Sequence, residues 1–274
     1  MRENGWYGAL IGDMVGSAYE CSPRPEEPFP LWSPKSHPTD DSILTIATMD
    51  LIVWNAFKAP VCNHTQALSA PYRYWAKRYP NAGYGERFLL WRDSLNGEPS
   101  DSKGNGAAMR VSPIAYIARS EEEVLDLAAT SAKLTHNTPE GIKGAQAIAL
   151  LTYLALQGAN KEELAKRACH FYPCVSQGYF RLAMRSQPSA LAEDTVPLAI
   201  VSFLASSSFE DCLRHGVLAG PDRDTIAAMA GSIGGAYYGI DSALVQTAIA
   251  HFSDPEVTEV LKRFGALIAS KQGL

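Results

Sequence analysis

Two short acidic stretches in this sequence carry the residue types best suited to binding divalent cations. They read Thr-Asp-Asp at residues 39–41 and Asp-Arg-Asp-Thr at residues 222–225, so each combines two carboxylates with a threonine hydroxyl. These oxygen donors suit Mg²⁺, Mn²⁺ or Ca²⁺ and argue against zinc. If the two stretches met in one site, their four carboxylates would repel one another unless cations lay between them. The pattern therefore indicates a metal site built from two distant segments.

Both acidic stretches come directly before helical patterns. Apolar residues recur at helical spacing over residues 43–49 and 226–236. Carboxylates at helix N-termini are stabilised by free backbone N–H groups and by the helix dipole, typically by about 0.3–1 kcal/mol each. Ordinary capping is therefore the alternative explanation for each stretch taken alone, because Asp and Thr are common N-cap residues.

Two further stretches contain candidate ligand-binding residues. Residues 102–110 read Ser-Lys-Gly-Asn-Gly-Ala-Ala-Met-Arg, and their glycines let backbone N–H groups approach a ligand before a helix that we expect to begin at about Ala107. A glycine-rich loop leading into a helix suits phosphate groups, but the same residues also serve an ordinary tight turn. His136 stands just ahead of another expected helix start, and a lone histidine is more often structural than functional.

The N-terminal part of the chain contains a helical pattern of small residues and then a long loop. Residues 8–18 are rich in Gly, Ala and Ser. Because glycine destabilises a helix by roughly 1 kcal/mol relative to alanine, we expect this helix to pack closely against a neighbour, with Asp13 facing a polar seam. Six prolines between Cys21 and Pro38 exclude a regular element there. Loops of this length are commonly lids or binding segments, and Glu20 stands at the hinge of this one.

Helical patterns with recognisable starts cover the rest of the chain. Ser120, Asn160 and Ser207 each precede a glutamate by three residues, which is the capping-box pattern. Strand signals are nearly absent, because no hairpin turn separates two alternating runs. We therefore expect an all-α protein of roughly a dozen helices, with residues 1–274 forming a single domain and the irregular segments carrying the chemistry.

The composition argues against several classes of protein. With 274 residues, of which 46% are hydrophobic and 19% charged, the chain can bury a large core. A net charge of −5 without a Lys/Arg stripe argues against a nucleic-acid or acidic-membrane partner. No apolar run reaches the ~20 residues that span a bilayer, and the polar N-terminus lacks a secretory signal. Five cysteines without CxxC spacing fit reduced thiols, so we expect a cytoplasmic protein.

Five short motifs are much more specific when read together than any of them is alone. They are Gly8-Ala9-Leu10-Ile11-Gly12-Asp13 with Gly16 and Glu20, then Thr39-Asp40-Asp41, Gly104-Asn105-Gly106-Ala107-Ala108-Met109-Arg110, Thr135-His136, and Asp222-x-Asp224-Thr225. In type and order they resemble the motifs of the ADP-ribosylglycohydrolase family. The resemblance runs from about Gly5 to Gly239, which is nearly the whole chain.

The resemblance implies an orthogonal all-helical fold with a two-metal centre, usually magnesium and sometimes manganese. By similarity, the metal ligands are Thr39, Asp40, Asp41, Asp222, Asp224 and Thr225. The diphosphate of ADP-ribose would be cradled by Ser102, Gly104, Asn105 and Gly106, and His136 would line the nucleotide pocket. Glu20 is similar to the family's flap glutamate and is expected to be catalytic, together with Asp41 and Asp224. The implied reaction is metal-dependent hydrolysis that removes ADP-ribose from a modified protein side chain or another ADP-ribose derivative.

The chain departs from the family pattern beside the second acidic stretch. Pro221 stands where a second glycine is usual, and Arg223 replaces a small hydroxyl residue between the two aspartates. A guanidinium close to bound cations would compete with them unless it points away, so the second metal site is the one affected. Two alternatives to the enzyme follow. One is a protein of the same fold that binds ADP-ribose without hydrolysing it, and the other is a purely structural relative.

Overall fold

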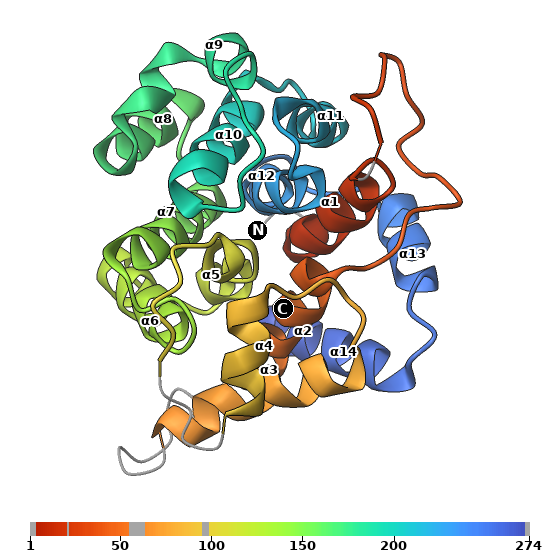
Figure 1. The fold of residues 1–274 in the computed structure, drawn as a ribbon, viewed down its shortest axis with the longest axis vertical. Helices are drawn as coiled ribbons and strands as arrows, with labels where there is room; N and C mark the ends of the chain where they lie inside the picture. The colour runs from red at the N-terminus through yellow and green to blue at the C-terminus, as the bar shows by residue number, and fades with distance from the viewer. Residues whose placement is uncertain (1–3, 21, 55–63, 95–98, 272–274) are drawn as a thin grey trace.

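The computed structural model describes residues 4–20, 22–54, 64–94 and 99–271, and it confirms the predicted all-α fold class (Figure 1). These residues form fourteen α-helices and three short 3₁₀ helices, and they contain no strand beyond two isolated bridges. The 3₁₀ helices are η1 (Gly5–Tyr7), η4 (Ser112–Tyr116) and η5 (Pro173–Gln177). The first seven α-helices are α1 (Gly8–Ser17), α2 (Asp40–Val53), α3 (His64–Arg78), α4 (Glu86–Asp93), α5 (Gly106–Met109), α6 (Glu121–Lys133) and α7 (Pro139–Leu156). The others are α8 (Lys161–Phe171), α9 (Tyr179–Ala183), α10 (Ala192–Ala205), α11 (Phe209–Ala219), α12 (Arg223–Tyr238), α13 (Ser242–Ala250) and α14 (Pro255–Lys271).

Helices α1 and α12 lie side by side at the centre of the fold and touch along their backbones (Figure 1). A Cβ atom added at Gly12 would lie 2.1 Å from the carbonyl oxygen of Ala227, and one added at Gly16 would lie 2.5 Å from that of Arg223. Only glycine leaves room for so close an approach. The close packing predicted from the small residues of α1 is therefore confirmed, and it sets the first turn of α12 against the C-terminal end of α1.

Helix α12 is enclosed by its neighbours. It packs against α1, α7, α10 and α11, and every residue from Arg223 to Ala236 is buried. Beyond its first three residues, Arg223-Asp224-Thr225, its sequence is mostly small and apolar on all faces, which is the pattern of a helix without a solvent-facing side. Because close-packed interiors resist local shifts, the first turn of α12 is a fixed platform for side chains.

The helix starts predicted from capping patterns are confirmed in two cases and displaced in one. Ser120 caps α6, and Asn160 caps α8 with a complete capping box. The start predicted at Ser207 is wrong by one residue. Ser208 is the N-cap of α11 and accepts a hydrogen bond from the backbone N–H of Asp211. Ser207 instead donates its hydroxyl to the carboxylate of that aspartate, so either serine satisfies the local pattern and the sequence alone does not separate them.

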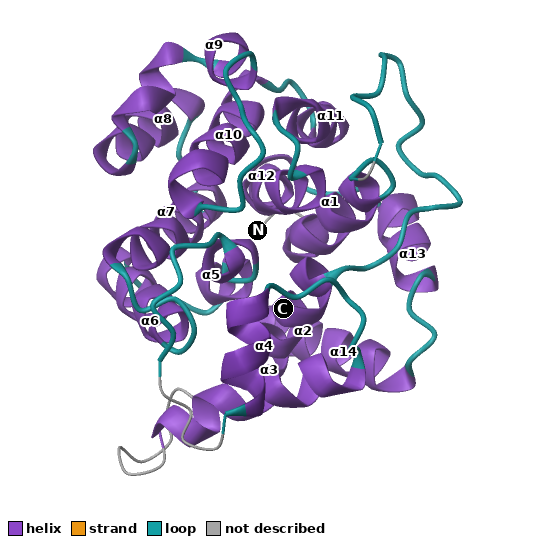
Figure 2. Cartoon of the chain, in the orientation of Figure 1, coloured by secondary structure: helices purple, strands orange, loops and turns teal. Residues whose placement is uncertain are grey.

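The segment between α1 and α2 has no regular structure in its described residues, as its prolines predict (Figure 2). It is nevertheless anchored to the globule by a buried side chain in its middle and by a hydrogen bond to α1 near its C-terminal end. The rings of Tyr19 and Phe29 meet edge to face with centroids 5.0 Å apart, and Phe29 is buried. Near the C-terminal end of the segment, the hydroxyl of Ser17 donates to the carbonyl of His37 over 2.8 Å. The loop that carries Glu20 is therefore held on α1.

Two expectations from the composition concern thiols and membranes. Cys169, Cys174 and Cys212 are free thiols, whereas Cys21 and Cys62 lie outside the described residues. Within the described ranges, no helix combines the length and the apolar character needed to cross a bilayer.

Replacing Gly12 with alanine tests the backbone contact between α1 and α12. Because the new Cβ would overlap the Ala227 carbonyl, we expect Gly12→Ala to lower the free energy of unfolding by about 3 kcal/mol, the upper part of the usual range for overpacking. The measurement is urea denaturation followed by circular dichroism. Gly265→Ala in α14 is the matched control, because its Cβ would meet only the side chain of Trp6, at 3.3 Å. Equal stability of the two variants would contradict the packing described here.

Candidate metal centre and adjoining cleft

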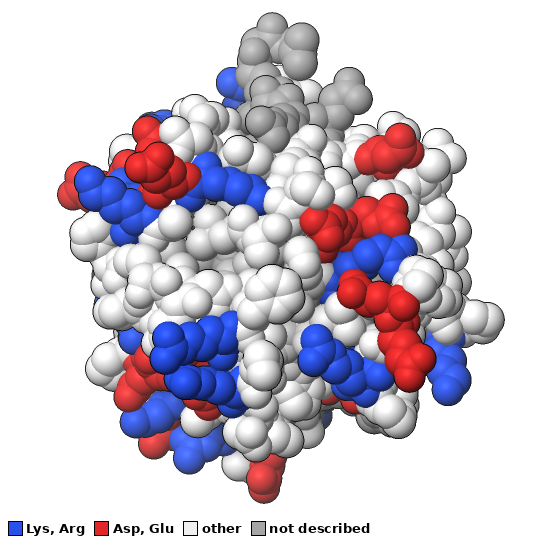
Figure 3. Space-filling view, turned by 90° about the horizontal axis from the view of Figure 1, so that it is seen from above, with Lys and Arg blue, Asp and Glu red and all other residues white. Residues whose placement is uncertain are grey.

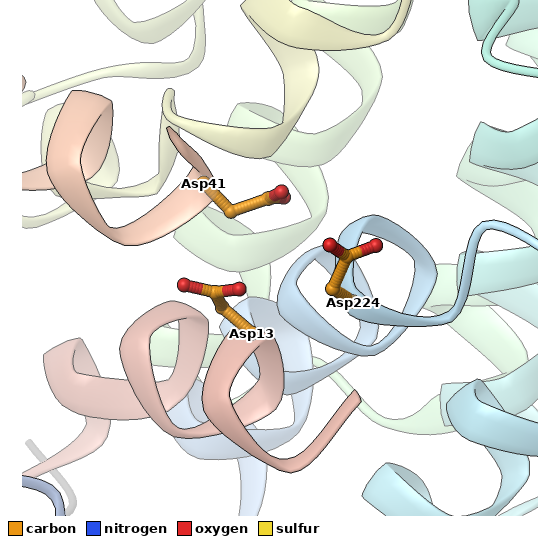
Figure 4. Close-up of side chains that lie close together, drawn as sticks. All are labelled: Asp13, Asp41 and Asp224. Atoms are coloured by element: carbon orange, nitrogen blue, oxygen red, sulfur yellow. The ribbon is translucent and has the colours of Figure 1, made fainter. Parts of the chain in front are cut away.

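Three carboxylates from three different helices face one another next to the contact between α1 and α12. They are Asp13 of α1, Asp41 of α2 and Asp224 of α12 (Figure 4). One oxygen of each carboxylate lies within 4.8 Å of an oxygen of both others. The hydroxyl of Thr225 also donates to Oδ2 of Asp41 over 3.1 Å. The two acidic stretches, far apart in the sequence, therefore meet in one site.

Asp13 organises this centre, although the sequence analysis assigned it no ligand role. Its Oδ1 accepts a hydrogen bond from the Thr39 hydroxyl at 2.6 Å, and its Oδ2 accepts from the backbone N–H groups of Thr39 at 2.9 Å and Ser42 at 3.1 Å. Through these hydrogen bonds Asp13, which is fully buried, caps the start of α2 from the neighbouring helix α1. One feature of the sequence could have indicated this role. Asp13 stands in a helix of small residues that was expected to pack closely, and a carboxylate buried in such a contact requires hydrogen-bond partners.

A second group of carboxylates lies beside the first and shares Asp224 with it. One oxygen each of Glu20, Asp222 and Asp224 lies within 4.8 Å of the others. The side-chain amide of Asn105 donates to Oδ2 of Asp222 over 2.6 Å, which ties the second acidic stretch to the glycine-rich loop. The backbone N–H of Asp224 lies 3.5 Å from Oε2 of Glu20. The hinge glutamate is therefore at the edge of the same centre.

Burial and mutual repulsion oppose ionisation of the aspartates in this centre. Loss of hydration, followed by the charges of Asp13 and Asp222, raises the pKa of Asp40 to about 7. Loss of hydration, followed by the charge of Glu20, raises the pKa of Asp222 to about 6. Burial is also the first cause of the raised pKa values of Asp13, Asp41 and Asp224. At neutral pH the cluster would carry negative charge at a high cost unless positive charge accompanied it.

The donor atoms of this centre fit hard divalent cations. Oδ1 of Asp41 is buried and has no hydrogen-bond partner among the described residues. A buried carboxylate oxygen without a partner is costly, and a cation would satisfy it while neutralising its neighbours. All available donors are carboxylate or hydroxyl oxygens, which is the chemistry of Mg²⁺ or Mn²⁺ sites. The residues that could hold such ions are Thr39, Asp40, Asp41, Asp222, Asp224 and Thr225.

A cleft of about 610 Å³ opens beside the acidic centre. Its lining includes Glu20, Asp40, Asp222, Asp224 and Thr225 of the centre, and Ser102, Gly104, Asn105, Gly106 and His136 of the candidate nucleotide site. Thr39 and Asp41 are buried and do not line it. The lining also includes Gly83, Gly85 and Phe88, which could not be found from the sequence because a short turn before a helix carries no chemical signal. All five residues that were predicted to bind the nucleotide therefore line the same cavity, which adjoins the acidic centre.

The glycine-rich loop is fixed against the start of α10. The backbone N–H of Asn105 donates to the carbonyl of Ala190 over 2.9 Å, and the N–H of Gly104 donates to the hydroxyl of Ser102 over 3.1 Å. Helix α5 begins at Gly106, close to the predicted start, but it has only four residues. Its dipole is correspondingly small, so anion binding here would depend on side chains and loop N–H groups rather than on a helix terminus.

Arg223 does not turn its guanidinium to the carboxylates on either side of it in the sequence. Its Nη1 donates to the backbone carbonyls of Tyr19 at 2.5 Å, Ser22 at 2.9 Å and Glu20 at 3.2 Å. These carbonyls belong to the loop that carries the hinge glutamate. Arg223 therefore ties this loop to the first turn of α12, and its charge is directed towards the loop backbone.

Charged side chains are interspersed on the face of the molecule shown in Figure 3. Basic and acidic side chains adjoin one another in groups at the left and right of this view, and uncharged surface lies between the groups. This face therefore carries no single-sign field of the kind that steers charged macromolecules.

The sequence model of the ADP-ribosylglycohydrolase family matches residues 3–272 of this chain. The human protein named ADP-ribosylhydrolase ARH3 is 29% identical to it over an alignment that covers 85% of this chain and 84% of that protein. A Pseudomonas putida protein named ADP-ribosylarginine hydrolase Tri1 is also 29% identical, and the alignment covers 85% of this chain and 69% of that protein. A solved structure described as an ADP-ribosylglycohydrolase-related protein complex shares the fold, with a TM-score of 0.72, 23% identity and 95% coverage of both chains.

Removing divalent cations should make the stability of the fold depend on pH in a defined direction. The folded pKa values of Asp40 and Asp222, about 7 and about 6, lie above the ordinary value of 3.8. Between these values the folded protein binds more protons than the unfolded chain, so the free energy of unfolding falls as the pH rises. We expect the melting temperature in EDTA to fall between about pH 5 and about pH 8, and Mg²⁺ to raise it more at the higher pH, because cations compete with protons for these ligands.

Two variants serve as controls for this measurement. Asp41→Asn should weaken the response to Mg²⁺, whereas Asp126→Asn, at an exposed position of α6, should keep it. A melting temperature that is indifferent to Mg²⁺ at both pH values would contradict the fit of the centre to cations.

Removing the Arg223 guanidinium should loosen the loop that carries Glu20. Hydrogen bonds from a charged donor stabilise more than neutral ones, so we expect Arg223→Ser to accelerate amide hydrogen exchange in this loop by at least about tenfold. The measurement is hydrogen exchange followed by mass spectrometry. Arg24→Ser, at an exposed position of the same loop, should leave the exchange rates unchanged. Equal exchange in the Arg223 variant and the wild type would show that the three carbonyl contacts do not hold the loop.

Proposed function

Because this chain belongs to the ADP-ribosylglycohydrolase family, we propose that it is a hydrolase that releases ADP-ribose from a modified protein side chain. The observation that carries the proposal is the cleft that joins the acidic centre to the glycine-rich loop. Its volume of about 610 Å³ lies in the range of cavities that hold small ligands. Two of the chain's relatives bear names that describe hydrolysis of ADP-ribosylated substrates, one of them at arginine, which supports this substrate class.

The acidic centre is the part of the cleft that we assign to two Mg²⁺ or Mn²⁺ ions. The ligands would be Thr39, Asp40, Asp41, Asp222, Asp224 and Thr225, and Asp224 belongs to both groups of carboxylates. When bound, such ions supply Lewis acidity that orients ribose hydroxyls and makes water more acidic. The contribution of Asp13 is to hold the hydroxyl and the backbone of Thr39, so that the start of α2 keeps its place in the centre.

Glu20 is the residue that we assign to proton transfer. Cleavage at the anomeric carbon of the distal ribose builds positive charge on the sugar. Water then bonds to that carbon and gives up a proton, and the departing side chain takes one up. Glu20 lines the cleft and approaches Asp222 and Asp224, so its carboxyl group lies at the edge of the centre and is open to the cleft. Asp41 and Asp224 would act on the reaction through the ions that they hold, because Asp41 itself does not line the cleft.

The glycine-rich loop is the part of the cleft that we assign to the diphosphate. Ser102, Gly104, Asn105 and Gly106 all line the cleft, and their side of it adjoins Asp222 through the side-chain amide of Asn105. A ligand spanning both regions would place its distal ribose at the acidic centre and its phosphates at the loop. This order matches the order of groups in ADP-ribose.

The alternative of a protein that binds ADP-ribose without hydrolysing it depends on Arg223 displacing a cation. The carbonyl contacts of Arg223 favour the hydrolase, because they direct the guanidinium to the loop backbone. We therefore retain the enzyme as the proposed function.

Substitution of the acidic centre tests this proposal. We expect Asp41→Ala and Asp224→Ala each to lower kcat/KM for release of ADP-ribose by at least about a hundredfold, because each removes a ligand of the ions that would act on the transition state. The measurement is free ADP-ribose released in Mg²⁺ from peptides modified at arginine and, separately, at serine. Helical content is checked by circular dichroism, and Asp126→Ala is the surface control.

Three results would count against the proposal. Full activity of both the Asp41→Ala and the Asp224→Ala variant would show that the acidic centre is not needed for the reaction. Full activity in excess EDTA would show that the reaction does not depend on a divalent cation. Binding of ADP-ribose by a wild-type protein that releases none of it from any modified peptide would establish the binding protein instead.

A further inference from the structure

Arg110, directly after α5, is a fully buried arginine with no acidic partner at ion-pair distance among the described residues. Its side chain is 0% exposed, and its guanidinium lies over the ring of Tyr72, 4.2 Å from the ring centroid. Its Nη2 donates to the carbonyl of Ser131 at 3.2 Å and to the hydroxyl of Thr135 at 2.7 Å. Burying a cation among neutral oxygens is costly, so this residue requires an explanation beyond packing.

Thr135 connects Arg110 to His136. Its Oγ1 lies 2.8 Å from Nδ1 of His136. Because arginine can only donate, the Thr135 oxygen accepts from Arg110 and keeps its own proton to donate. Thr135 is buried, and the described residues offer its proton no acceptor other than this Nδ1. A proton on Nδ1 would leave the hydroxyl proton unpaired, so the favoured arrangement has Nδ1 as acceptor and the ring proton on Nε2.

The Nε2 atom of His136 lies next to the glycine-rich loop. His136 lines the cleft, and a Cβ added at Gly106 would come within 3.1 Å of Nε2. Burial and the charge of Arg110 lower the pKa of His136 to about 3, so the ring is neutral at physiological pH and carries one proton. No hydrogen-bond acceptor for Nε2 occurs in the described part of the chain. The donor is therefore available to a ligand at the loop.

We propose that Arg110 and Thr135 are positioning residues that hold His136 in the Nε2–H tautomer, so that His136 donates a hydrogen bond to a phosphate oxygen of the bound ligand. At neutral pH a diphosphate bridging two sugars offers only acceptors, so it requires a donor at this position. The absence of a side chain at Gly106 leaves the space in which the phosphate and the imidazole meet. The inference rests on the proposed function in one respect, namely that the ligand of the cleft contains the diphosphate of ADP-ribose.

The tautomer of His136 can be measured without turnover. In ¹⁵N-histidine-labelled protein, long-range ¹H–¹⁵N correlations distinguish a protonated ring nitrogen from an unprotonated one, and a His136→Gln spectrum assigns the signals among the six histidines. We expect the wild type at neutral pH to carry its proton on Nε2. Thr135→Val, which removes the hydroxyl but keeps the shape, should give a signal for protonated Nδ1, and Thr135→Ser should restore the wild-type pattern. A proton on Nδ1 in the wild type overturns the proposal, whatever the variants do.

The same variants separate phosphate recognition from recognition of the base. By calorimetry, Thr135→Val should weaken ADP-ribose binding by about tenfold, the loss of one hydrogen bond, and Thr135→Ser should bind as the wild type does. Adenosine, which has no phosphate, should bind the valine variant and the wild type alike, and Mg²⁺ affinity should not change. Equal losses for ADP-ribose and adenosine would overturn the assignment to phosphate, as would no loss for either ligand.

Failure of this inference is distinguishable from failure of the proposed function. A wild type that has the Nε2–H tautomer and binds ADP-ribose but hydrolyses no modified peptide would refute the hydrolase and leave the role of Arg110 and Thr135 standing. An active hydrolase with the His136 proton on Nδ1 would refute the role of Arg110 and Thr135 and leave the hydrolase standing.

Discussion

The backbone contact between α1 and α12 is the constraint on which the rest of the site depends. Gly12 and Gly16 let the two helices approach until side chains have no place between them. As a result Asp13, between these glycines, lies beside Asp224 in the first turn of the enclosed helix (Figure 4). Asp13 then holds the start of α2 through Thr39. One packing contact therefore places three helices and the carboxylates that they carry.

Charge is distributed in this fold so that stability and chemistry oppose each other. The aspartates of the centre are buried together, and their raised pKa values express the cost of that burial. Arg110 is likewise buried with neutral partners only, and Thr135 links it to His136 of the cleft lining. Buried charged groups, which destabilise a core, thus contact the lining of one cavity. Such placement is typical of residues retained for a ligand rather than for the fold.

The sequence predicts the elements of this protein better than the directions of its side chains. Helical periodicity and capping patterns locate the helices, and the cap at Thr39 is found where expected. The meeting of the two acidic stretches could be anticipated only because their motifs occur in a known order. The role of Asp13 was missed, because partners on another helix leave no local pattern. The direction of Arg223 was open, because a long side chain can reach either the carboxylates beside it or the loop that packs over it.

Asp224 belongs to both groups of carboxylates, and this has a consequence for how the centre fills. An ion that draws on this carboxylate leaves less negative charge for a second ion, and the two ions also repel each other. Successive affinities should then differ even if the surrounding ligands were equivalent. Under the proposed two-ion assignment, a limited supply of divalent cations would therefore leave a half-filled population, and full loading would require cation concentrations above those that fill the first position.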